Sequence, residues 1–132
     1  MAKKTARQRV VKRLDDVTSR YIRERDKACV QCGSKENLTN GHVFSRRAYN
    51  TRWDISENGN CHTQCWGCNF RHSKDNYDYF KWYRDKFGIE RFDELRFEYK
   101  TTRKITTAEL EELYEDLTEA YKELVDESET CQ

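Results

Sequence analysis

Two Cys-x-x-Cys pairs constrain this chain more than any other feature of its sequence. The first pair is Cys29 and Cys32, and the second is Cys65 and Cys68. Each pair supplies two thiolates from one tight turn, and four thiolates satisfy the tetrahedral coordination of Zn²⁺. Without a secretion signal, paired cysteines at this spacing indicate a metal site rather than disulfides. We therefore expect a structural zinc on these four residues, which requires two distant segments to meet.

The composition explains why such an ion would be useful. Of 132 residues, 36% are apolar and 37% are charged, so a core built from apolar burial alone would be thin and a metal would stabilise the fold. No apolar run is long enough to span a bilayer. The basic first residues are not followed by an apolar signal segment. We expect one domain with helical extensions in a cytoplasmic protein, with no membrane partner.

The net charge of +1 conceals segments of opposite sign. Residues 1–27 hold ten basic and four acidic side chains, residues 28–104 hold fourteen and ten, and residues 105–132 hold one and ten. The first two segments suit a polyanion, whereas the last should point away from one. We interpret them as a basic N-terminal helix, a zinc-clamped domain and an acidic C-terminal helix.

The hydrophobic pattern predicts a mostly helical α+β fold. The apolar stripe of the last helix is expected to pack on the N-terminal helix, although a second copy of the chain would also suit it. The basic face of the N-terminal helix suits either solvent or phosphate contacts. The expected elements are a helix over 5–27, a strand over 38–44, an extended segment over 51–55, a strand over 61–64, a helix over 68–87 ended by Gly88, a short helix within 89–99, and a last helix that begins at the N-cap Thr106.

The spacing between the cysteine pairs is a further clue. Thirty-two residues separate Cys32 from Cys65, whereas an ordinary zinc ribbon has roughly 15–20 there. The additional length includes Gly41, His42 and Asn60. The pairs therefore indicate a clamp that holds a strand–loop–strand unit against the helix that follows.

These residues, in this order, resemble an HNH (ββα-metal) endonuclease of the zinc-clamped kind, and more narrowly the NinG/Rap recombination nucleases of lambdoid phages. The resemblance spans about residues 28–98 and implies a zinc-clamped ββα-metal core with flanking N- and C-terminal helices, in the host cytoplasm. The matching residues are Cys29-x-x-Cys32, Gly41-His42, Arg52-Trp53-Asp54, Asn60-x-x-x-Gln64-Cys65-x-x-Cys68-Asn69, and Gly88-Ile89-Glu90-Arg91-Phe92.

The resemblance also implies roles for single residues. His42 would be the general base that takes a proton from the attacking water. Asn60 would pin the hairpin loop and orient His42. Asn69 would bind a catalytic Mg²⁺ or Mn²⁺, with His72 as a second ligand or a phosphate contact. Many HNH family members carry Asp or His just before the general base, where this chain, like NinG-like proteins, has glycine, Gly41.

A missing ligand at that position needs a replacement, because Mg²⁺ prefers carboxylate oxygens. Asp54 is the candidate, with His72 and His62 behind it. Cations around the proposed site would contact DNA phosphates rather than read sequence. These DNA-binding candidates are Arg46, Arg47, Arg52, Arg71 and Lys74.

The resemblance implies hydrolysis of phosphodiesters in branched recombination DNA, such as Holliday junctions and D-loops. Symmetric cutting of a junction needs two active sites, so a homodimer is possible. Two alternatives stay open: a non-catalytic, zinc-stabilised module that binds nucleic acid, and an adaptor that acts through the acidic C-terminal helix. Without the resemblance, His42 would be interpreted as a core or zinc-adjacent histidine.

Overall fold

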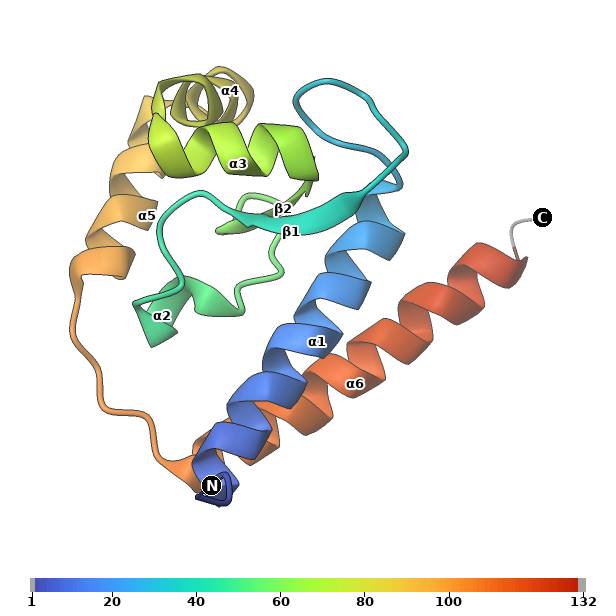
Figure 1. The fold of residues 1–132 in the computed structure, drawn as a ribbon, viewed down its shortest axis with the longest axis vertical. Coiled ribbons are helices and arrows are strands. Elements are labelled where there is room, and N and C mark those ends of the chain that lie inside the picture. The colour runs from blue at the N-terminus through green and yellow to red at the C-terminus, as the bar shows by residue number, and fades with distance from the viewer. Residues whose placement is uncertain (1, 131–132) are drawn as a thin grey trace.

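The computed structural model describes residues 2–130, and of Thr130 only the backbone; it shows a small central sheet surrounded by helices (Figure 1). The fold is mostly helical α+β, as the sequence predicts. None of the helices among these residues is long and apolar enough to cross a membrane. The elements in chain order are α1 (Ala6–Asp26), β1 (Leu38–His42), α2 (Tyr49–Arg52), β2 (Cys61–Cys65), α3 (Trp66–Lys74), α4 (Tyr77–Phe87), α5 (Ile89–Lys100) and α6 (Thr107–Thr130).

Strands β1 and β2 form a two-stranded antiparallel sheet, in which His42 pairs with Cys61 and Gly41 pairs with His62. Because side chains alternate across a strand, these two pairs lie on opposite faces. The face of Gly41 and His62 contacts α4, where the Tyr79 hydroxyl donates to the Gly41 carbonyl over 2.7 Å. The His42 side chain therefore lies on the face of the sheet opposite to His62.

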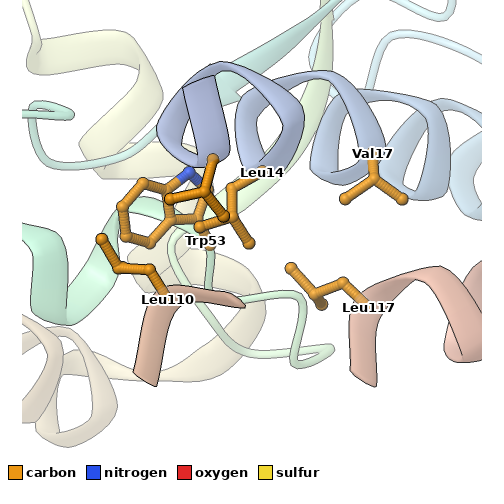
Figure 2. Close-up of a cluster of buried hydrophobic side chains, with 6 residues drawn as sticks. Leu14, Val17, Trp53, Leu110 and Leu117 are labelled. Atoms are coloured by element: carbon orange, nitrogen blue, oxygen red, sulfur yellow. The ribbon is translucent and has the colours of Figure 1, made fainter. Parts of the chain in front are cut away.

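A first apolar cluster joins α1 to α6. It contains Leu14 and Val17 of α1, Leu110 and Leu117 of α6, and Trp53 from the segment after α2 (Figure 2). The two helices start at the same end of the molecule and run side by side in the same direction (Figure 1). The expectation that the last helix packs on the N-terminal helix is confirmed.

A second apolar cluster lies beneath α4 and α5. Phe44, just after β1, packs there against Tyr79 and Tyr83 of α4 and Phe92 and Leu95 of α5. The loop that connects the two strands contributes to both clusters, through Trp53 to the first and Phe44 to the second, so the flanking helices are built into the fold. Their packing fixes the position of the chain on both sides of His42.

Two local predictions are wrong. Residues 51–55 are not extended: the short helix α2 covers their start, and Trp53 behind it is buried in the first cluster. The helix expected over 68–87 is divided at Asp75, whose backbone is extended with a φ of −149°. The Asp75 side chain accepts a hydrogen bond from the Tyr77 N–H over 3.0 Å, an Asx interaction that competes with helical pairing and starts a new helix. Gly88 ends α4 as predicted, with a φ of 93° that favours glycine.

Candidate zinc centre and histidine-lined cleft

The first cysteine pair lies in a tight turn. The Cys29 N–H donates to the Ser34 carbonyl over 2.8 Å, and the Gly33 N–H donates back to the Cys29 carbonyl over 2.9 Å. Gly33 has a φ of 81°, in the region that favours glycine. The Val30 N–H donates to the Thr63 carbonyl over 2.9 Å and ties the turn to β2.

The second pair lies where β2 passes into α3. The Cys65 sulfur accepts from the Cys68 N–H at 3.5 Å and so caps the helix. All four thiol sulfurs lie within 4.8 Å of one another, and the Cys32 and Cys65 sulfurs are 3.7 Å apart. A tetrahedral zinc with Zn–S bonds of about 2.3 Å needs sulfurs about 3.8 Å apart. The predicted convergence of the four cysteines is confirmed.

The charges of the cluster also fit a bound cation. Burial, followed by the neighbouring thiols, raises the pKa of Cys68 to about 12. Burial also raises the pKa of Cys29, but backbone N–H groups outweigh it and lower that pKa to about 7. Arg71 places a guanidinium nitrogen 3.1 Å from the Cys68 sulfur. A zinc ion would convert the crowded thiols to thiolates. With four protein ligands it would keep no open position, as in structural sites.

The fifth described cysteine is separate from this cluster. Cys61 is fully buried, and burial raises its pKa to about 12. Its thiol lies 3.3 Å from the carbonyl oxygen of Arg52, to which it donates. Cys61 is therefore an inert core thiol at the opposite end of β2 from Cys65.

An open cleft of about 910 Å³ lies between α1, β1, α3 and α5. Three of the predicted catalytic or ion-binding residues, His42, Asn69 and His72, lie in its wall. The polar and charged side chains of the wall are Asp15, Asp16, Ser19, Asn40, His42, Ser45, Arg46, Asn69, His72, Ser73, Asn76, Arg96 and Lys100.

His42 is held in one tautomer. Its Nε2 lies 2.9 Å from the Arg52 carbonyl oxygen, and a carbonyl can only accept, so Nε2 carries the hydrogen and Nδ1 has a free lone pair. Burial lowers the pKa of His42 to about 4. The imidazole is therefore neutral at pH 7, which is the protonation state that a general base requires.

Two other predicted residues fix the chain next to His42. Asn60 is fully buried, and its side chain both donates to and accepts from the backbone of Phe44, each over 2.8 Å. His72 points Nε2 at the carbonyls of His42 and Val43, at 2.9 and 3.1 Å. By the same tautomer argument, His72 donates through Nε2, which leaves a buried Nδ1 with no partner.

The residues predicted to bind a catalytic ion do not converge. Asn69 and His72 line the cleft, but the Asp54 carboxylate accepts from the N–H and the hydroxyl of Ser56, at 3.1 and 2.7 Å, and is not part of the cleft wall. Across residues 2–130, the four cysteines form the one group of three or more His, Cys, Asp or Glu side chains close enough to hold a metal. The expected approach of Asp54 to Asn69 is not formed, and the predicted set does not fit a single Mg²⁺ or Mn²⁺.

The structure explains why a glycine occupies position 41, where many HNH nucleases carry a metal ligand. A Cβ atom on Gly41 would lie 2.1 Å from the side-chain oxygen of Gln64. Gln64 is fully buried on the neighbouring strand. A ligand side chain at position 41 would therefore require Gln64 to move.

One of the predicted DNA-binding cations lines the cleft. Arg46 is exposed in its wall, while Arg47 lines a smaller pocket next to it. Arg52 instead forms an ion pair with Asp15 over 2.6 Å. Asp15 also accepts from the Trp53 indole over 2.8 Å. Arg52 thus joins α1 to the loop that holds His42.

The other cations of the cleft come from an element outside the predicted site. Arg71 and Lys74 of α3 are not part of the cleft wall, whereas Arg96 and Lys100 of α5 contribute to it. Nothing in the spacing of Arg96 and Lys100 marks them as site residues. They reach the cleft because α5 packs on Phe44 through the second apolar cluster.

The sequence was compared with known protein families, curated proteins and solved structures. A family model described as Bacteriophage Lambda NinG protein matches residues 1–127. No curated protein and no solved structure matches the chain. The matched range covers the four-cysteine cluster and every wall of the cleft.

Proposed function

The chain belongs to the bacteriophage lambda NinG family, a family related to phage recombination, and from this premise we propose that it is an HNH-type endonuclease. It hydrolyses phosphodiester bonds in branched DNA, such as Holliday junctions and D-loops. The observation that carries the proposal is the position of His42: a neutral imidazole with a free Nδ1, held in the wall of an open cleft that is also lined by Arg46, Arg96 and Lys100. The order β1, β2, α3 and the adjoining thiol cluster support the HNH assignment.

The residues of the cleft suit this reaction. Arg46, Arg96 and Lys100 attract the phosphate backbone. His42 Nδ1 takes a proton from a water whose oxygen forms the new bond to phosphorus, while the bond from phosphorus to the leaving sugar oxygen breaks. A phosphate next to His42 raises the pKa of its imidazole and makes it a stronger base.

A divalent ion, Mg²⁺ or Mn²⁺, belongs to the proposal as a requirement of the reaction. Such an ion supplies stabilisation of charge on the phosphate and the leaving oxygen. Because Asn69, Asp54 and His72 do not form one ligand set, we assign no step to it. A homodimer is also part of the proposal, because two active sites are needed to cut a junction symmetrically.

The test is cleavage of a labelled four-way junction in Mg²⁺ or Mn²⁺, beside a linear duplex of the same sequence. We expect metal-dependent cleavage of the junction that exceeds cleavage of the duplex. Binding of the junction without cleavage in either metal would overturn the enzyme proposal. That result would favour a non-catalytic, zinc-stabilised DNA-binding module, which the scattered ligand set also supports.

An adaptor role for α6 would need a different test. Leu110 and Leu117 of this helix are buried against α1, so deletion of residues 105–132 would expose the first apolar cluster. Neutralising the exposed acids Glu111, Glu115 and Glu119 leaves that packing intact. If these substitutions to Gln leave phage recombination unchanged, the adaptor hypothesis fails.

A further inference from the structure

The outer face of α3 carries an exposed aromatic pair. Trp66 and Phe70 are 62% and 48% exposed. Their rings are stacked, with centroids 5.3 Å apart and planes 12° apart. The ammonium of Lys74 lies 5.5 Å from the centre of the Phe70 ring. We call Trp66, Phe70 and Lys74 the aromatic platform.

The zinc cluster holds this platform in place. Trp66 follows Cys65 directly and precedes Cys68 by two residues, so its backbone lies between two of the four thiols. The Trp66 N–H also donates to the Asn37 carbonyl over 2.8 Å. A platform fixed in this way loses little conformational entropy when it binds a ligand.

The chemistry of the platform favours nucleic acid over an apolar partner. Large exposed aromatic side chains side by side indicate an interaction site. Helix α3 carries the cations Arg71 and Lys74 and no acidic residue, so its outer face attracts an anion. Flat rings beside cations are the features on which bases of single-stranded DNA stack, whereas bases in a duplex are already stacked on each other.

We propose that the aromatic platform stacks an unpaired base of DNA at the edge of the cleft. Ser73 of the same helix lines the cleft, and it lies seven residues, or almost two turns, after Trp66. The two side chains therefore project from nearly the same side of α3. A base on Trp66 places the following phosphates at the cleft, which suits branched DNA with a single-stranded segment, such as a D-loop. The placement of the phosphates at the cleft rests on the proposed function, but stacking of a base on Trp66 does not require that the protein cleaves DNA.

The experiment is a fluorescence titration of the zinc-loaded protein with oligothymidylate, without added Mg²⁺ or Mn²⁺. Trp66→Ala and Phe70→Ala should each weaken binding about fivefold or more. The matched control is Phe97→Ala on α5, whose side chain is 74% exposed, and it should bind like the wild type. Oligothymidylate should quench the tryptophan fluorescence of the wild type. In Trp66→Phe the quenching should disappear while most of the affinity is kept.

Wild-type affinity in both Trp66→Ala and Phe70→Ala would overturn the proposal, and would leave the aromatic pair as a protein interface. Quenching that persists in Trp66→Phe would also overturn it. Zinc content and circular dichroism of each variant show whether it is folded. Cleavage of the four-way junction is scored separately. If Trp66→Ala cleaves the junction and binds oligothymidylate normally, the base-stacking proposal fails and the proposed nuclease activity stands. If the wild type shows quenching of Trp66 but no cleavage, the proposed nuclease activity fails and the base-stacking proposal stands.

Discussion

The four-cysteine cluster and the cleft both use residues of helix α3, but only the cluster brings its ligand atoms together around one point. Cys68 belongs to the cluster, and Asn69, the next residue, lines the cleft. The four sulfurs lie within 4.8 Å of one another, which is enough to enclose an ion. The polar side chains of the cleft surround an open volume and converge on no point. The cluster supplies all four ligands that a structural zinc needs, whereas the cleft has the form of a site completed by its substrate.

The largest expected effect is in the cluster. Cys68→Ala should abolish zinc binding and cooperative folding, because structural zinc contributes on the order of 10 kcal/mol in small domains. Zinc content, about one per chain in the wild type, and thermal unfolding measure this. The matched control, Cys61→Ala, removes a buried thiol outside the cluster; it should keep the zinc and cost about 1–2 kcal/mol. A Cys68→Ala variant that unfolds like the wild type would remove the distinction between the two sites.

The cluster was predictable from the sequence because its geometry is local. Two residues between cysteines define each turn, so Cys29 and Cys32 must present thiols together wherever the chain goes. The strands and the capping of α6 at Thr106 follow equally local rules. The packing of α6 on α1 is not local, but the apolar stripes of the two helices indicated it.

The cleft was predictable only in part. His42, Asn69 and His72 lie in its wall, but Asp15, Arg96 and Lys100 arrive from helices whose positions depend on two apolar clusters. Asp54 was misplaced because its carboxylate binds within its own turn, an alternative that spacing does not reveal.

The second largest expected effect is the loss of stability at acid pH that comes from His42 in the cleft. Burial lowers the pKa of His42 to about 4, below the usual 6.5, so the unfolded state binds this proton first. The free energy of unfolding that depends on neutral His42 is at its maximum above pH 6.5. It decreases by up to roughly 3 kcal/mol as the pH falls toward 4. Glutamine can still donate to the Arg52 carbonyl. Urea unfolding of His42→Gln, with zinc content monitored, should therefore show a shallower loss of stability than the wild type. Parallel curves would contradict the buried, neutral imidazole.

A smaller effect is expected where α1 meets the cleft. Asp15→Asn should destabilise the protein by roughly 2 kcal/mol, because it leaves the Arg52 guanidinium partly buried without its counter-ion. The adjacent Asp16, whose side chain is 51% exposed beside Lys12, is the matched control, and Asp16→Asn should change stability by about 0.5 kcal/mol or less. Zinc content should stay unchanged in both. Equal stabilities of the two variants would show that the ion pair does not hold the cleft wall.

The smallest effect concerns DNA affinity. Lys100→Ala should remove roughly one phosphate contact. The slope of the logarithm of the junction-binding constant against the logarithm of the salt concentration should therefore become shallower by about 0.9. Lys81→Ala on α4, where the lysine pairs with Asp85 at the surface, should leave the slope unchanged. Binding isotherms at several salt concentrations measure both. Identical slopes for the two variants would exclude Lys100 from the DNA path.

The most direct test of the account is the behaviour of His42→Ala on a labelled four-way junction in Mg²⁺ or Mn²⁺. If the zinc cluster supplies structure and the cleft supplies chemistry, zinc content and junction binding should match those of the wild type. The cleavage rate should fall by roughly 10²- to 10⁴-fold. Cleavage by zinc-loaded His42→Ala at the wild-type rate would contradict the role of His42 as the general base.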